Sequence, residues 1–243
     1  MPLKALLFDK DGTLIHFNQT WHPAALSVMR TQTRGDAAAL AKLARALDYD
    51  LESRSFRKGA SFVAGTWADY GAPWAAALGL ENNKQFERDT NILLNRAGIE
   101  ALAPVGNPLK ILEQLSELGL ALGVATNDVE FAARAQCHAL GLTDMLNYVA
   151  GCDSGHGAKP HPGMVLAFAS ALQLPAQHVG MVGDSTHDMQ AAREAGAIAI
   201  AVLTGPATRE EIEPFADHIL NSIDELPDFV TAFNAAKHRT QNL

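Results

Sequence analysis

Two pairs of aspartates stand directly after short apolar runs of the sequence. Asp9 and Asp11 follow the apolar run at 3–8, while Asp184 and Asp188 follow another at 178–182. Carboxylates held close together repel, so their pKa values separate unless a cation bridges them. One can then act as a nucleophile while the other serves as an acid or base. Carboxylates without His or Cys at ligand spacing favour a hard, oxygen-liganded cation, and Mg²⁺ is the expected one.

The first pair belongs to the segment Asp9-Lys10-Asp11-Gly12-Thr13-Leu14. Strand alternation would place the Asp9 and Asp11 carboxyls on one side and turn Lys10 away, with an ion pair behind the strand as its role. Gly12 permits a sharp turn whose N–H groups can form a nest for an anion. The alternative for this segment is an Asp-rich turn without a ligand, and for Asp188 it is helix capping.

Two other residues could bind the oxygens of a phosphoryl group. Thr126, followed by Asn127, ends the apolar run at 120–125, and Lys159 lies in a Lys-Pro-His-Pro turn before a helix-length segment. A hydroxyl donor and an ammonium beside a metal–carboxylate centre are suited to phosphate. Taken singly, Thr126 could be an ordinary strand end and Lys159 a solvated lysine.

The elements that must position these residues alternate along the chain. Apolar runs of strand length alternate with helix-length segments such as 108–118 and 189–195, the runs being 3–8, 120–125, 178–182 and 197–203. This order predicts an α/β fold with a Rossmann-like, doubly wound parallel sheet and helices on both faces. Ligands bind at the carboxyl ends of such strands, so the polar residues after each run should meet in one crevice.

The segment 17–103 lacks the short continuous apolar runs and contains Ala-rich stretches of helix length instead. Helical stretches are expected at 23–33, 36–47, about 60–69 and 83–97, with Asp36 as an N-cap and Gly98 as a stop signal. Both ends of the segment join the same predicted sheet. We therefore expect an α-helical cap domain at 17–103, inserted into a core domain made of 1–16 and 104–243.

Composition restricts the partners. The chain has 243 residues, 48% of them hydrophobic, and 19 Lys plus Arg against 27 Asp plus Glu, giving a formal charge of −8. An acidic chain argues against nucleic acid and anionic membranes as default partners. Its two cysteines lack a disulfide or metal pattern, and no run approaches a membrane span. We expect a cytoplasmic monomer or homodimer, and this composition does not exclude a small phosphorylated ligand.

The motifs together resemble the haloacid dehalogenase (HAD) superfamily, and within it the phosphoglycolate-phosphatase-like branch. The resemblance covers residues 3 to about 205 and rests on four segments in order: Asp-Lys-Asp-Gly-Thr-Leu at 9–14, Thr-Asn at 126–127, Lys-Pro-His-Pro at 159–162 and Gly-Asp-Ser-Thr-His-Asp-Met at 183–189. It departs from the branch at Lys10, where an aromatic or aliphatic residue is more usual.

This resemblance implies a role for each residue of the motifs. Asp9 would be the nucleophile that forms an aspartyl-phosphate, and Asp11 the acid and base. Mg²⁺ would be held by the Asp9 carboxylate, the Asp11 backbone carbonyl and Asp184. The resemblance further places Thr126, Lys159 and the backbone near Asn127 on the phosphate, and Asp188 on the metal or behind it.

The implied activity is that of a Mg²⁺-dependent phosphomonoester hydrolase, with 2-phosphoglycolate as the first compound to test. One alternative is a phosphomutase of the β-phosphoglucomutase kind. A different class of alternative is a non-catalytic binding or regulatory protein with the same fold. In the cap, Arg54, Arg57, Lys58 and Ser61 could meet the leaving group or form a solvated basic surface.

Overall fold

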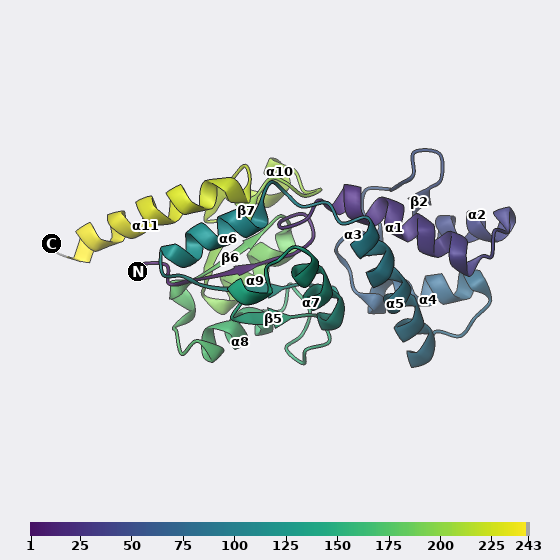
Figure 1. Cartoon of the computed structure of the whole chain (residues 1–243), viewed down its shortest axis with the longest axis horizontal. Coiled ribbons are helices and arrows are strands. Elements are labelled where there is room, and N and C mark those ends of the chain that lie inside the picture. Colours follow the sequence, from purple (N-terminus) through teal and green to yellow (C-terminus); the bar gives the residue numbers. More distant parts are fainter. Residues whose placement is uncertain (242–243) are drawn as a thin grey trace. The chain divides into compact units, whose positions relative to one another are not determined.

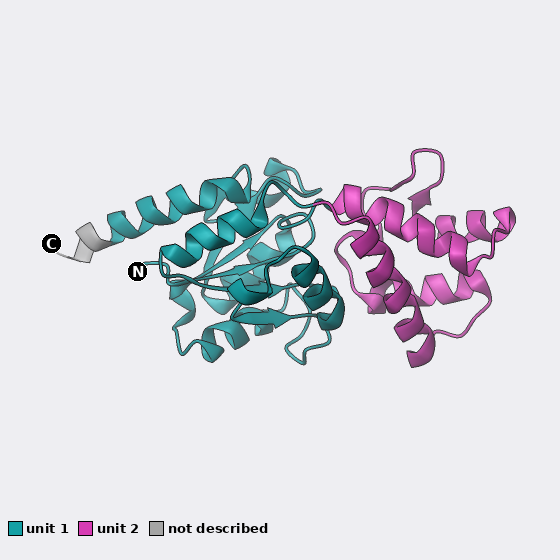
Figure 2. Ribbon diagram, viewed as in Figure 1, with its two compact units in different colours: residues 1–16, 104–243 teal, residues 17–103 magenta. Residues whose placement is uncertain are grey.

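The computed structural model describes residues 1–241 as two compact units (Figure 1). Residues 1–16 and 104 onwards form the first unit, and residues 17–103 form the second (Figure 2). The chain leaves the first unit after His16 and returns at Pro104, which forms an antiparallel bridge with Ile15. The last two residues of the predicted core domain, 242–243, lie outside the described part.

The first unit is built on a six-stranded parallel sheet in the order β5-β4-β1-β6-β7-β8. Its strands are β1 (Ala5–Phe8), β4 (Ala121–Ala125), β5 (Tyr148–Ala150), β6 (Val179–Gly183), β7 (Ile198–Val202) and β8 (His218–Leu220). The four predicted strands are confirmed. The edge strands β5 and β8 were not predicted, because three residues are too few to show a period.

Alternating side chains of the central strands feed two separate cores. In β1, Leu6 and Phe8 join a cluster with α6 and α11, while Ala5 and Leu7 join one with α8 and α9. The helices of this unit are α6 (Pro108–Glu117), α7 (Glu130–Ala139), α8 (Gly163–Ala171), α9 (Thr186–Ala195), α10 (Arg209–Ile212) and α11 (Leu226–Gln241). Burial on both faces confirms the doubly wound α/β fold.

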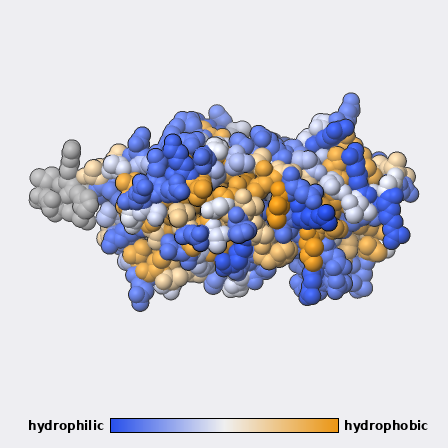
Figure 3. Space-filling view, in the orientation of Figure 1, coloured by the Kyte–Doolittle hydropathy of each residue, from blue (hydrophilic) through white to orange (hydrophobic). Residues whose placement is uncertain are grey.

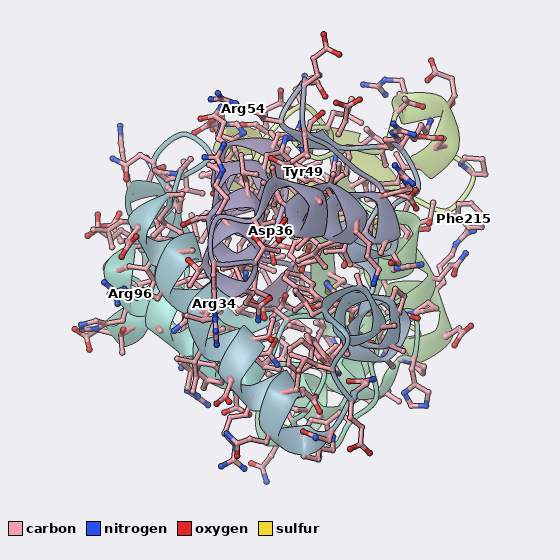
Figure 4. The ribbon with its side chains drawn as sticks, turned by 90° about the vertical axis from the view of Figure 1, so that its right-hand side faces the viewer. Arg34, Asp36, Tyr49, Arg54, Arg96 and Phe215 are labelled. Atoms are coloured by element: carbon pink, nitrogen blue, oxygen red, sulfur yellow. The ribbon has the colours of Figure 1, made fainter. Side chains whose placement is uncertain are left out.

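The second unit is mostly helical and has its own aromatic core. Its elements are α1 (Phe17–Gln32), α2 (Ala37–Ala46), β2 (Tyr49–Asp50), β3 (Ser55–Phe56), α3 (Ser61–Ala64), α4 (Trp67–Leu78) and α5 (Lys84–Glu100). Trp74 is fully buried, and Phe56 stacks on Phe62 with ring centroids 4.6 Å apart. Asp36 caps α2 as predicted, since its carboxylate accepts hydrogen bonds from the N–H groups of Ala38 and Ala39 (Figure 4).

Two local predictions in this unit are wrong. Gly98 does not end α5, which continues to Glu100, because the buried glycine lies in a helix that packs against α1 and tertiary contact outweighs propensity. The single helix expected at 60–69 is instead the short α3 and the start of α4, divided at Gly65. The short hairpin of β2 and β3 was not predicted either.

The described surface is mixed in polarity. Figure 3 shows hydrophilic and hydrophobic residues interspersed over the visible face. Within residues 1–241, we find no helix that combines the length and the apolar composition needed to cross a membrane.

Candidate active site

The carboxyl ends of three neighbouring strands place three of the predicted residues at one edge of the sheet. Asp9 follows β1, Thr126 follows β4 and Asp184 follows β6, and all three are buried. The Asp9 N–H donates to the Val182 carbonyl at 2.8 Å, which extends the pairing of β1 with β6 by one residue. Sheet register therefore fixes the backbone from which these side chains project.

Lys159 lies among the carboxylates as a buried cation. Its Nζ is 2.6 Å from Asp9 Oδ1, 2.6 Å from Asp188 Oδ1 and 3.0 Å from the Ala125 carbonyl. The Asn127 side chain holds the backbone of the lysine from both sides, accepting from the Lys159 N–H at 2.8 Å and donating to its carbonyl at 2.9 Å. Asn127 thus locks the Lys159 turn onto the end of β4.

Asp188 forms the helix cap that the sequence offered as one interpretation, and it also contacts Lys159. Its Oδ2 accepts from the Ser185 N–H at 3.0 Å and from the Ser185 hydroxyl at 2.6 Å, closing a capping box at the start of α9. Its Oδ1 accepts from Lys159. The helix cap therefore also aims a carboxylate at the site.

Three carboxylates could together hold a metal ion. One oxygen from each of Asp9, Asp184 and Asp188 lies within 4.8 Å of the others. Gly12 and Gly205 leave space around Asp184, since a Cβ on either glycine would overlap its carboxylate. This buried donor set offers oxygen only and is anionic, which fits a hard cation such as Mg²⁺.

Burial, reinforced by the closeness of the acids to one another, shifts the pKa values of Asp9 and Asp184. Burial, opposed by Lys159 and reinforced by Asp188 and Asp11, raises the pKa of Asp9 to about 7. Burial together with Asp9 and Asp188 also raises the pKa of Asp184 well above its ordinary value. Burial lowers the pKa of Lys159, but Asp188 and Asp9 outweigh it and leave that pKa above the usual range. A bound divalent cation would relieve the repulsion among the acids.

Lys10 and Asp11 differ from the prediction. Lys10 does not turn away from both aspartates: its fully buried Nζ lies 2.6 Å from Asp11 Oδ2, and Asp11 is outside the acidic cluster. The reason is that β1 ends at Phe8, so strand alternation no longer governs residues 9–11. The Lys10 ammonium also contacts Gln136 Oε1 at 2.7 Å and Asp128 Oδ2 at 3.2 Å.

The sequence interpretation missed several residues that support the site. Thr13 donates to Asp184 Oδ1 at 3.2 Å, and Thr204 donates to the Gly12 carbonyl at 2.6 Å. Thr204 and Gly205 closely follow β7. The aspartates were identified as the polar residues after apolar runs, and the same search after the run at 197–203 would have found these two residues. Gln136 carried no such signal, because a single glutamine in a helix is usually a surface residue.

Comparison with known proteins agrees with this arrangement. Residues 3–196 match the family model described as haloacid dehalogenase-like hydrolase. A phosphoglycolate phosphatase of Rhodospirillum rubrum is 31% identical over 215 residues, covering 87% of this chain and 83% of that protein. A protein of Dickeya dadantii, named probable phosphatase IndB, is 36% identical over 124 residues, covering 51% of this chain and 53% of that one.

The solved structure of an HAD phosphatase from Thermococcus onnurineus has the same fold, with a TM-score of 0.66 at 23% identity over 94% of this chain and 98% of that one. The family model spans most of the sequence, and Asp9, Thr126 and Asp184 lie at the carboxyl edge of one parallel sheet. This chain is therefore an enzyme of the haloacid dehalogenase-like hydrolase family, related in sequence to phosphatases.

Proposed function

We propose that this protein is a Mg²⁺-dependent phosphomonoester hydrolase that acts on a small phosphorylated metabolite through an aspartyl-phosphate on Asp9. The observation that carries the proposal is the buried contact of Lys159 with both Asp9 and Asp188, beside Asp184. The similarity to the Rhodospirillum rubrum enzyme makes 2-phosphoglycolate the first substrate to test.

We assign the metal to the carboxylates of Asp9 and Asp184 and to the backbone carbonyl of Asp11. Asp188 is either a further ligand or the group that orients Lys159. When bound, Mg²⁺ supplies positive charge that lets a phosphate dianion approach the carboxylates and stabilises the charge of the transition state.

The residues of the chain divide the reaction into two steps. In the first, a carboxylate oxygen of Asp9 forms a bond to phosphorus while the ester P–O bond breaks. The leaving oxygen takes the electron pair of that bond and a proton from Asp11. In the second, a water oxygen attacks the same phosphorus and gives a proton to Asp11. The bond between Asp9 and phosphorus then breaks, inorganic phosphate is released and the Asp9 carboxylate is restored.

Lys159 and Thr126 then have the task of binding the transferring group. The Lys159 ammonium, held by Asn127 at the end of β4, provides a fixed positive charge. The Thr126 hydroxyl and the backbone N–H of Asn127 are the donors that we assign to the phosphoryl oxygens. Donors that are fixed before the substrate binds need no reorganisation during the reaction.

The first experiment measures phosphate release from a panel of small phosphomonoesters, including 2-phosphoglycolate, with and without a chelator. We expect Mg²⁺-dependent turnover, and a loss of at least about 1,000-fold in kcat for Asp9→Asn because the nucleophile is gone. Asp36→Asn, at an exposed helix cap in the other unit, is the matched control and should retain activity. No hydrolysis of any ester, together with no effect of Asp9→Asn, would leave a non-catalytic protein as the answer.

The covalent intermediate is tested separately. Asp11→Asn should slow attack by water, so acid quenching followed by peptide mass spectrometry should find one phosphoryl group on the peptide that contains Asp9. Activation by a sugar bisphosphate, with the phosphoryl group returned to a sugar instead of water, would replace the hydrolase proposal with a phosphomutase.

A further inference from the structure

Lys10 is a buried cation that the proposed mechanism does not use. The side chain of Lys10 is fully buried. In the proposed mechanism Asp9 is the nucleophile and Thr126 and Lys159 bind the phosphate, which leaves Lys10 without a role. Burying a lysine is costly unless its ammonium is paired and hydrogen-bonded. A turn residue between two aspartates could reach solvent easily, so this burial needs a reason.

Three oxygen atoms lie close to the Lys10 ammonium, one from the next residue and two from distant parts of the chain. These are Asp11 Oδ2 at 2.6 Å, Gln136 Oε1 at 2.7 Å and Asp128 Oδ2 at 3.2 Å. Asp11 Oδ2 and Gln136 Oε1 accept hydrogen bonds from the ammonium, and Asp128 Oδ2 forms an ion pair with it. Because Lys10 stands between Asp9 and Asp11 in the sequence, this arrangement lies next to the groups that we propose to react.

Two of these three oxygen atoms belong to residues that the fold fixes. Asp128 Oδ1 accepts from the Val129 N–H at 2.7 Å, and the Asp128 N–H donates to the Thr126 hydroxyl at 3.1 Å. Gln136 is fully buried on α7. Asp11 lies in the turn after β1, and its Oδ2 accepts from the ammonium at 2.6 Å. The ammonium therefore connects residues held at the end of β4 and on α7 to the Asp11 carboxylate.

We propose that Lys10 is a positioning residue that orients the Asp11 carboxyl for proton transfer, with Asp128 and Gln136 as its anchor. By holding Oδ2, Lys10 sets the plane of the carboxyl group and hence the direction of its second oxygen. This inference rests on the proposed function, since it assumes that Asp11 is the acid. Small displacements of an acid matter because proton transfer requires hydrogen-bond distance in the transition state.

The test compares two substrates that differ in their need for an acid. The leaving group of an alkyl phosphate such as 2-phosphoglycolate is a strongly basic alkoxide, which needs a proton. The leaving group of p-nitrophenyl phosphate is a stable phenolate, which does not. For both, kcat/KM reports the steps up to departure of the leaving group. We expect Lys10→Met to lower kcat/KM for the alkyl ester about 10- to 100-fold, with less than a threefold change for the aryl ester.

A double-mutant cycle makes the role of Asp11 explicit. In an Asp11→Asn background, Lys10→Met should change kcat/KM for the alkyl ester less than twofold, because the group that Lys10 positions is already gone. Lys4→Met, which removes an exposed lysine just before the same strand, is the matched control and should change neither substrate. Equal losses for both esters, or losses that simply add to those of Asp11→Asn, would overturn the inference.

Gln136→Met provides a second route if Lys10→Met does not fold. It keeps every charge and removes one acceptor from the anchor, so it should show the same substrate split at smaller size, about three- to tenfold. Circular dichroism confirms folding in each case. If the wild-type protein hydrolyses neither ester, the proposed function fails. If it hydrolyses both and the variants show no split, only the role of Lys10 fails.

Discussion

At the scale of single residues, the site is a cluster of ionisable groups that the fold buries and holds close together. Asp9, Asp184 and Asp188 are all buried, and Lys159 contacts two of them. One ammonium does not neutralise three carboxylates. The metal-free site therefore stores repulsion that protonation or a cation must relieve, and this gives stability a dependence on pH.

We predict that the metal-free protein loses stability as pH rises from about 4 to about 7. The pKa of Asp9 is raised from 3.8 to about 7 in the folded state, so within that window the folded protein keeps a proton that the unfolded chain releases. The unfolding free energy then falls with pH and levels off above the folded pKa. Thermal unfolding with chelator at pH 5, 6, 7 and 8 measures this, and Mg²⁺ should raise Tm more at pH 8 than at pH 5.

Asp9→Asn is the control for that measurement. Because Asn does not titrate, the decline of Tm between pH 5 and 7 should become shallower. The raised pKa of Asp184 should account for the decline that remains. A Tm that rises over this interval in the metal-free wild type would contradict the prediction.

The glycines around Asp184 provide a second prediction. Gly205→Ala should lower Mg²⁺ affinity and kcat about 10- to 100-fold, because the added Cβ overlaps the Asp184 carboxylate and displaces it. Overpacking of this kind also costs about 1–3 kcal/mol of stability. Calorimetric titration with Mg²⁺ gives the affinity. Gly35→Ala meets no atom within 4 Å and should leave the Mg²⁺ affinity unchanged, although its φ of +80° makes this substitution lower stability as well.

At the scale of elements, strand ends and helix starts supply the chemistry. Strands β1, β4 and β6 deliver Asp9, Thr126 and Asp184 to one edge, and the first turn of α9 adds Asp188. The capping box of α9 satisfies the helix N-terminus and also directs a carboxylate at Lys159. One hydrogen-bond motif thus performs a structural and a functional task.

We predict that Ser185→Ala lowers both stability and activity. Loss of the hydroxyl that donates to Asp188 at 2.6 Å should cost about 1 kcal/mol and let Asp188 move from Lys159, lowering kcat about threefold or more. Thr66→Ala is a close match, because its hydroxyl donates to Asp69 in the capping box of α4, in the other unit. Chemical unfolding should show a similar loss for both. Unimpaired kcat in Ser185→Ala would mean that Asp188 does not need the cap.

At the scale of the whole molecule, each unit has its own hydrophobic core. One centres on the six-stranded sheet, and the other on Trp74 and the aromatic rings around it. The ends of the insertion are adjacent, since Ile15 and Pro104 are bridged. In the inserted unit, Arg54 is exposed between β2 and β3, with a φ of 53° (Figure 4).

We predict that the sheet-containing unit folds without the insertion. Replacing residues 17–103 by a short Gly-Ser linker should give a soluble chain that unfolds cooperatively, because no strand of the sheet and no residue of the acidic cluster is removed. Circular dichroism and Mg²⁺ titration measure the outcome, with the same deletion carrying Asp184→Asn as the control for metal binding. A chain without cooperative unfolding would show that the insertion is needed for the fold.

The sequence by itself determined the parallel core and the polar residues that follow three of its strands, Asp9, Thr126 and Asp184, because apolar runs and the residues that end them are local patterns. The change from apolar runs to helix-length stretches also predicted an insertion at 17–103. The tertiary structure alone decided that Lys10 reaches Asp11, Asp128 and Gln136, and that Gly205 packs against Asp184. The contacts of Lys10 with Asp128 and Gln136 join residues more than one hundred positions apart. The direction of a side chain in a turn, such as that of Lys10 toward its neighbour Asp11, depends on what the rest of the fold places beside it.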